Sequence, residues 1–467
     1  MDSDGPGAKA GPDNDKEGKP SMRPIIFAAL CSATPVAAQT APPADPVTVI
    51  HAGRLLAHAD RPAEGPSTIT VRAGRIERVE RVERGLAPPP AGARLINLSG
   101  MTVLPGLIDA HVHLASDRAG NEGLLAGVTE SAPLHAYEAQ MNARKTLEAG
   151  FTTVRNLGDG GGVTLALRDA IARGWVQGPR IVDAGMSIST TSGHMDERLG
   201  LNEEAAEALA HTDNLCDGVE ECRRAVRRQV GRGADVIKIA TTAGVNSVIA
   251  AGLGQQMFDD EAKAIVDTAK LYGKKVAVHA HGASGIALAL RAGAHSIEHG
   301  TLLSDEEVRL FRQSGAYYVP TLSTVNGYKE RLARDPNAYS PAVREKIEWR
   351  IGVTGKALQR AVKGGVKIAF GTGAGVSKHG RNADEFELMV AHGMTPRTAL
   401  AAATLGAADL LGLAGEVGSI EPGKAADVIA VEGDPLQNVT VLKRVRFVMR
   451  AGAVAKGGGL DGAAPRP

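Results

Sequence analysis

The sequence predicts an α/β fold: a (β/α)8 TIM-like barrel with a small β-sandwich domain built from both termini. Apolar strand-like runs alternate with helical patterns along the middle of the chain, and short alternating strand patterns occur at both ends. The length of 467 residues suits a large barrel with a satellite domain better than one small domain. With 43% hydrophobic residues, the chain can bury a substantial core.

The beginning of the chain is predicted to be processing sequence. Residues 1–21 are polar and are interpreted as a disordered extension or tag. Residues 22–38 combine a short basic start, an apolar run and small residues at positions −3 and −1, which is typical of a secretory signal peptide. Residues 39–46 are then a linker, and we expect an exported protein, periplasmic or secreted.

A membrane or buried helix is the alternative for this apolar run. The run is too short to span a bilayer, and Pro24 and Pro35 bracket it. Since no other apolar stretch is long enough to span, we expect no membrane association after processing.

The charge balance argues against a nucleic-acid partner. Lys and Arg number 53 against 52 Asp and Glu, which gives a net charge of +1. Aromatic residues make up only 3%, too few for platforms on which bases stack. We therefore expect a small-molecule partner.

Strand patterns at the two ends predict the β-sandwich domain over residues 47–100 and 415–455. Alternating apolar residues separated by Gly and Pro mark its strands. The candidate strands are 47–50, 67–71, 75–79, 427–431 and 445–449.

Residues 101–414 are predicted to form the barrel. Its eight candidate strands are 102–113, 152–157, 180–187, 235–240, 275–281, 295–298, 317–322 and 366–372. Helical patterns lie between them, including 260–272, 283–292, 304–314 and 341–364. In such barrels the chemistry gathers at the C-terminal ends of the strands, which directs attention to those positions.

Histidines occur at three of these strand ends. His111 and His113 close the first strand, His279 and His281 the fifth, and His299 follows the sixth. Alternate strand residues point the same way, and imidazole is a common metal ligand. A single pair would fit ordinary core or surface histidines as well, but the set together predicts a metal site.

Lys238 lies inside the apolar fourth strand, where a charged amine is costly unless something satisfies it. One interpretation is a side chain that extends to solvent at the barrel end. The other is a lysine that binds metal or takes part in catalysis.

The motifs around these residues resemble the amidohydrolase superfamily. The run LPGLIDAHVH at residues 104–113 is similar to its first-strand signature, and residues 418–428 resemble the return into its small β domain. Residues 234–244, 278–282 and 296–300 resemble a branch of exported enzymes that hydrolyse peptides at a C-terminal residue. That branch includes prolidase-like and Xaa-Arg dipeptidases and ochratoxin-hydrolysing amidohydrolases. The resemblance covers roughly residues 47–455.

The resemblance implies two divalent metal ions, with zinc the ion expected. His111 and His113 would bind the more buried ion, and a carboxylated Lys238 would bridge both. His279 and His299 would hold the second ion, with His281 as a competitor for the place of His279.

The resemblance also implies substrate contacts and an assembly. His194, in the loop 191–196, matches a His-bearing loop near the substrate; an ordinary loop histidine is the alternative. The branch commonly forms homo-oligomers, up to octamers.

Gly373 is a departure from the family pattern. The family has an aspartate in a Gly-Thr-Asp-Ala-Gly run at the end of the eighth strand, whereas residues 371–375 here read GTGAG. That aspartate is expected to ligate metal and to carry the proton from the attacking water to the leaving amine. We therefore hypothesise an impaired enzyme; the nearest downstream candidates for a replacement base are His379, Asp384 and Glu385.

The same glycines resemble a dinucleotide-binding loop, but Val376 stands where that fingerprint needs Gly or Ala, and the acidic residue about 20 positions on is missing. An oxidoreductase is therefore disfavoured.

The expected function is hydrolysis of an amide or peptide bond that releases a C-terminal amino acid. Dipeptides, N-acyl amino acids and ochratoxin-like amides are the candidate substrates. The alternatives are a catalytically weak metal- and substrate-binding variant, and a cyclic-amide hydrolase or deaminase of the same superfamily. Whether Cys216 and Cys222 pair stays open at this point.

Overall fold

A computed structural model provides the structure of the chain. It describes residues 47–82, 88–209, 213–248, 252–458 and 461–462. The predicted extension, signal peptide and linker (1–46) lie outside the described residues, so export stays a prediction. Within the described ranges, no helix is both long and apolar enough to cross a bilayer.

One eight-stranded sheet combines the two ends of the described chain. Its strands lie in the order β15-β14-β13-β4-β1-β2-β3, and β16 also pairs with β4. Inward-facing residues such as Ile50, Ile69 and Ile96 form its apolar core, as the alternating pattern requires. A two-layer sandwich stays a prediction. The strands are β1 Thr48–Leu55, β2 Ser67–Arg72, β3 Arg75–Arg81, β4 Arg94–Pro105, β13 Val428–Val431, β14 Phe447–Arg450, β15 Ala453–Lys456 and β16 Asp461–Gly462.

Strand β4 runs past residue 100, where we predicted the domain boundary. Its last residues pair with β13, and β5 begins after a single residue, Gly106. The predicted strand 102–113 is therefore two strands in two sheets. A side chain has no room at the junction, because a Cβ on Gly106 would lie 2.1 Å from Thr152 Oγ1.

Eight parallel strands form a TIM-barrel-like arrangement, in two sheets of order β5-β6-β7 and β12-β11-β10-β9-β8. Each overlaps one of the eight predicted strands. They are β5 Leu107–Val112, β6 Phe151–Asn156, β7 Arg180–Asp183, β8 Val236–Ala240, β9 Lys275–Ala280, β10 Ser296–His299, β11 Tyr317–Val319 and β12 Lys367–Ile368.

Backbone hydrogen bonds join the two sheets on both sides. The His113 N–H donates to the Ala374 carbonyl at 2.7 Å, beyond the end of β12. On the other side, the Ile188 N–H donates to the Lys238 carbonyl at 2.8 Å. The end of β5 thus lies beside the segment after β12, and β8 lies beside the segment after β7.

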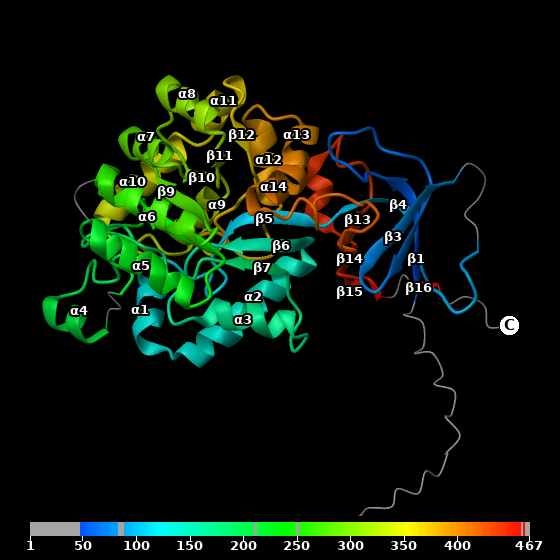
Figure 1. The fold of residues 1–467 in the computed structure, drawn as a ribbon, viewed down its shortest axis with the longest axis horizontal. Coiled ribbons are helices and arrows are strands. Elements are labelled where there is room, and N and C mark those ends of the chain that lie inside the picture. Colours follow the sequence, from blue (N-terminus) through cyan, green and yellow to red (C-terminus); the bar gives the residue numbers. More distant parts are fainter. Residues whose placement is uncertain (1–46, 83–87, 210–212, 249–251, 459–460, 463–467) are drawn as a thin grey trace, which may run out of the picture. The chain divides into compact units, whose positions relative to one another are not determined.

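Helices lie around the outside of these strands (Figure 1). The predicted helix 341–364 is two helices, α10 and α11, separated at Gly355, whose φ of 81° is unfavourable for other residues. The helices are α1 Asn121–Thr129, α2 Ala132–Glu148, α3 Val163–Ala172, α4 Glu203–Leu209, α5 Val219–Gly231, α6 Asp259–Leu271, α7 Ala283–Ala292, α8 Asp305–Ser314, α9 Thr324–Arg334, α10 Pro341–Gly352, α11 Lys356–Lys363, α12 Asp384–Ala391, α13 Pro396–Ala401, α14 Ala407–Leu411, the π-helix Ala402–Gly406 and the 3-10 helix Val439–Arg444.

Cys216 and Cys222 are joined by a disulfide in the structure. Both are fully buried, and Cys222 belongs to α5. The bond ties the start of this helix to the segment that precedes it.

Candidate metal centre

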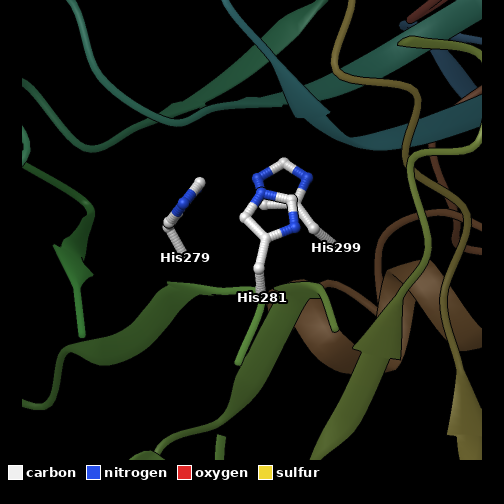
Figure 2. Close-up of side chains that lie close together, drawn as sticks. All are labelled: His279, His281 and His299. Carbon is white, nitrogen blue, oxygen red and sulfur yellow. The ribbon is translucent and has the colours of Figure 1, made fainter. Parts of the chain in front are cut away.

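Histidines from three strand ends converge at one end of the barrel-like strands. The ligand nitrogens of His279, His281 and His299 lie within 4.8 Å of one another, and Figure 2 shows the three rings together. His111 and His113, from the end of β5, adjoin this group. The His111 ring centroid lies 5.0 Å from that of His299 and 5.3 Å from that of His113. The structure thus brings together the five histidines that the sequence singled out.

The His111 and His113 rings present their Nε2 atoms to each other at 3.3 Å. Two nitrogens bound to one tetrahedral zinc at about 2.0–2.1 Å would lie about 3.3–3.4 Å apart. The other ring nitrogens face acceptors: His111 Nδ1 lies 2.9 Å from Glu298 Oε2, and His113 Nδ1 lies 3.0 Å from the Gly158 carbonyl. Each Nδ1 therefore carries the proton, and each Nε2 is free to bind an ion.

The remaining three histidines lie at or just beyond the ends of β9 and β10. His281 Nδ1 lies 2.8 Å from the Thr301 hydroxyl, and His299 Nδ1 lies 2.7 Å from the Thr321 hydroxyl. His279 Nε2 is buried without a hydrogen-bond partner among the described residues. A buried nitrogen left unpaired is costly, and a metal ion would satisfy it. This donor set fits a divalent ion.

Burial keeps these rings uncharged. It lowers the pKa of His113 to about 4 and of His194 to about 3. Burial also lowers the pKa of the other four histidines of the site well below 6.5: His111, His279, His281 and His299. Neutral imidazole is the form that binds metal.

Lys238 lies in β8 with 1% of its surface exposed, so the interpretation of a side chain that extends to solvent is wrong. The pKa of its amine is lowered to about 7, mainly by burial, with Glu298 opposing and Arg155 adding to this shift. Part of the population is thus uncharged at neutral pH.

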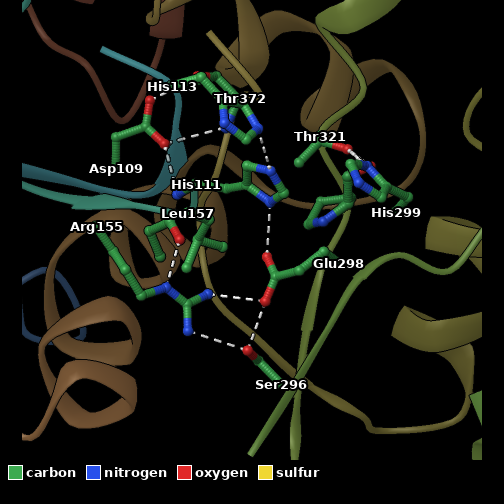
Figure 3. A network of polar contacts seen from close by, with 12 residues as sticks. Asp109, His111, His113, Arg155, Leu157, Ser296, Glu298, His299, Thr321 and Thr372 are labelled. Carbon is green, nitrogen blue, oxygen red and sulfur yellow. Dashed lines mark hydrogen bonds and ion pairs between the residues drawn. The ribbon is translucent and has the colours of Figure 1, made fainter. Parts of the chain in front are cut away.

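Three buried charged residues of the site were not singled out from the sequence: Asp109, Arg155 and Glu298 (Figure 3). Asp109 accepts hydrogen bonds from the His111 N–H at 3.1 Å and the Thr372 hydroxyl at 2.6 Å. Burial raises the pKa of Asp109 to about 6. Asp109 is a charged residue within the apolar start of β5, the same signal that drew attention to Lys238, whereas Arg155 and Glu298 have polar neighbours in β6 and β10 and give no such signal.

Gly373 lies between the two groups of histidines. Its N–H donates to the His111 carbonyl at 2.8 Å, and its φ is 66°. A Cβ at this position would lie 2.7 Å from Thr324 Cγ2 and 3.6 Å from Thr321 Cβ. The missing side chain would therefore face the loop whose Thr321 holds His299.

The three downstream candidates for a replacement base have structural contacts. His379 Nε2 donates to the His113 carbonyl at 2.9 Å. Asp384 forms an ion pair with Arg381 at 2.7 Å. Glu385 accepts two backbone N–H groups of the loop after β11, at 2.8 and 2.6 Å. These contacts give none of them a place at a reacting atom.

His194 lies beside the histidine group, with its ring centroid 4.0 Å from that of His279. Its Nδ1 lies 2.5 Å from Ser247 Oγ. It borders a cavity of about 370 Å³ that Leu124 and Tyr339 also line, and a second one of about 320 Å³ that His113 lines. This placement is suitable for contact with a substrate.

Known proteins share this fold and sequence. The model of the amidohydrolase family matches residues 102–455. Ochratoxinase from Aspergillus niger is 33% identical over 374 residues, 77% of this chain and 76% of that protein. The crystal structure of a Xaa-Pro dipeptidase with methionine in its active site superposes with a TM-score of 0.82 at 38% identity and covers 88% of this chain and 100% of its own.

A more distant relative is imidazolonepropionase from Symbiobacterium thermophilum, 28% identical over 459 residues, which cover 87% of this chain and 98% of that enzyme. The family match spans most of the chain, and the nearer relatives share its prolidase- and ochratoxinase-like branch. The chain therefore belongs to the amidohydrolase family and is a hydrolase of C–N bonds.

Proposed function

We propose that the chain is built as a binuclear metal-dependent hydrolase that releases a C-terminal amino acid from dipeptides, N-acyl amino acids or ochratoxin-like amides. The observation that carries this proposal is the 3.3 Å approach of His111 Nε2 and His113 Nε2 beside three further buried histidines. A closed (β/α)8 barrel and a β-sandwich complete the proposed architecture. Two of the relatives named above, an ochratoxinase and a Xaa-Pro dipeptidase, support the substrate class.

In this proposal His111 and His113 hold the first ion, and His279 and His299 hold the second. The unpartnered His279 Nε2 supports its choice over His281, whose Nδ1 is tied to Thr301 but whose Nε2 leaves it a competitor. Bound divalent ions, zinc being expected, would supply a water of lowered pKa and would polarise the scissile carbonyl. His194 would contact the substrate.

Carboxylated Lys238 would bridge the two ions. The uncharged amine forms a bond from its nitrogen to the carbon of carbon dioxide and releases one proton to solvent, which yields a carbamate anion. The burial of Lys238 and the lowered pKa of its amine support this step. The carbamate also replaces a costly buried cation by an anionic ligand.

Gly373 makes the chain an impaired member. The side chain that would take the proton of the attacking water and deliver it to the leaving amine is absent. A catalytically weak protein that binds metal and substrate is therefore the second candidate. A cyclic-amide hydrolase or deaminase is the third, and the similarity to imidazolonepropionase favours it.

The first experiment measures metal content together with hydrolysis of ochratoxin and a dipeptide panel, for the chain and for Gly373→Asp. Two ions per chain with turnover mainly in the Asp variant is the expected result. Equal turnover in both would contradict the role of position 373, and the absence of metal from both would overturn the proposal. Light scattering in parallel tests the proposed homo-oligomer, up to an octamer.

A further inference from the structure

A buried ion pair lies next to Nδ1 of His111. Glu298 and Arg155 are 0% and 2% exposed, and Arg155 Nη2 donates to Glu298 Oε1 at 2.8 Å. The Ser296 hydroxyl lies 2.5 Å from the same oxygen, while Glu298 Oε2 faces His111 Nδ1 at 2.9 Å. Figure 3 shows the chain of contacts from Arg155 through Glu298 to His111.

The chemistry of these groups determines where the His111 proton lies. A guanidinium only donates and an ionised carboxylate only accepts. Oε1 is taken by Arg155 and Ser296, so Oε2 is the acceptor left for His111. His111 must therefore carry its proton on Nδ1, which leaves Nε2 without one.

Arg155 is the cationic partner of this carboxylate, and their ion pair occupies Oε1. Arg155 also donates from Nε to the Ala110 carbonyl at 2.7 Å, directly before His111. The guanidinium thus fixes both the backbone and the side-chain partner of this histidine.

We propose that Glu298 and Arg155 are positioning residues that fix the His111 proton on Nδ1 and so keep Nε2 as a metal ligand. The inference rests on the proposed metal site. An orienting carboxylate behind a ligand histidine typically changes metal affinity about 10–100-fold. A purely structural ion pair would instead stabilise the fold without changing the ring tautomer.

The variant Glu298→Gln separates these two roles. Arg155 cannot accept a hydrogen bond, so the amide oxygen must face it and the NH2 group must face His111 Nδ1. His111 then accepts at Nδ1 and carries its proton on Nε2, which blocks the ligand atom. We expect zinc affinity at one site to fall about 10–100-fold, measured by competition with a chromophoric chelator.

The double variant Glu298→Gln with Arg155→Met provides the rescue. Without the guanidinium, the glutamine side chain at position 298 can rotate so that its amide oxygen accepts from His111 Nδ1. The Ser296 hydroxyl can donate to the amide oxygen or accept from the amide NH2 group. We expect zinc affinity above that of Glu298→Gln. The matched control is Glu307→Gln, another buried glutamate, which accepts from the Ser304 N–H at 2.8 Å at the start of α8; its zinc affinity should equal that of the parent chain.

Nitrogen-15 NMR of labelled histidine in the metal-free chain reads the tautomer directly, with the His111 signal assigned by its loss in His111→Asn. An Nδ1–H ring in the parent and an Nε2–H ring in Glu298→Gln support the inference. An Nε2–H ring in the parent overturns the inference. A zinc affinity that is the same in Glu298→Gln as in the double variant also overturns it. If the parent chain binds no metal, the proposed function fails, but the His111 tautomer in the parent still decides this inference. The same measurement on the parent decides it if Glu298→Gln does not fold.

Discussion

The two halves of the histidine cluster are held in different ways. In the β5 half, His111 and His113 donate from Nδ1 to a carboxylate and a carbonyl, which only accept. In the β9–β10 half, the Thr321 hydroxyl donates to the Pro320 carbonyl at 2.8 Å and therefore accepts from His299 Nδ1. The Thr301 hydroxyl beside His281 can donate or accept, and His279 Nε2 has no partner in the described part of the chain. These partners therefore fix the ring tautomers of His111, His113 and His299, whereas the tautomers of His279 and His281 are left open.

Gly373→Asp is the change with the largest expected effect, because position 373 lies between the two halves. We expect kcat/KM for amide hydrolysis to rise by about 10²–10⁴-fold, the usual contribution of a general acid–base group. Asp also tolerates the positive φ better than most residues. The matched control Gly373→Asn fills the same space without a titrating group, and an equal gain there would show that packing rather than proton transfer limits the rate.

The Thr324 methyl limits this reversion, since Cγ2 would lie 2.7 Å from the new Cβ. Thr324→Ser removes the methyl and keeps the hydroxyl, whose bond to the Thr321 carbonyl is 2.9 Å long. Gly373→Asp with Thr324→Ser should melt at a higher temperature than Gly373→Asp alone and should be at least as active. A lower melting temperature would show that the loop has room for the aspartate as it stands.

His279→Asn changes the β9–β10 half alone. We expect bound zinc to fall from two ions per chain to one, because the β5 half is fixed independently by Glu298 and Gly158. His281→Asn is the matched control, and elemental analysis after dialysis should still find two ions in it. Loss of both ions in His279→Asn would show that the halves bind as a unit, and the reverse behaviour of the two variants would exchange the roles of His279 and His281.

Asp159→Asn tests a buried carboxyl beside the β5 half. Burial, with a smaller contribution from the neighbouring Asp183, raises the pKa of Asp159 from 3.8 to about 8. The folded state therefore binds more protons than the unfolded state between these pH values, and the free energy of unfolding falls as pH rises through this window. Because the variant has no such proton, its melting temperature relative to the parent should be higher at pH 8 than at pH 5; an equal difference at both would contradict the assignment.

Thr321→Val has the smallest expected effect. It removes the hydroxyl that contacts His299 Nδ1 at 2.7 Å and keeps the shape of a fully buried residue. We expect a loss of about 1 kcal/mol in the free energy of unfolding, measured by chemical denaturation of the metal-free chain. Thr321→Ser keeps the hydroxyl, and an equal His299 ring tautomer in Thr321→Val and Thr321→Ser would show that this bond does not orient the ring.

The sequence located the strands, the helices and the converging histidines better than the contacts between them. Alternation predicted the eight barrel strands, and histidines at strand ends marked the residues that converge. Arg155 and Glu298 escaped notice because 143 positions separate them and they lie on strands of two different sheets, β6 and β10, which come together only in the fold. The break at Gly106 was missed because its cause is the side chain of Thr152, which lies far along the chain.

The short step from β4 to β5 has a consequence for how the chain can be divided. β4 pairs with β1 and β13 in the eight-stranded sheet, and only Gly106 separates it from β5, the strand that carries His111. A truncation that keeps only residues 101–414 would cut through β4 and release the anchored end of β5. The eight-stranded sheet thus holds the first residues of β5 in place. We expect this sheet and the barrel-like strands to unfold in one cooperative transition.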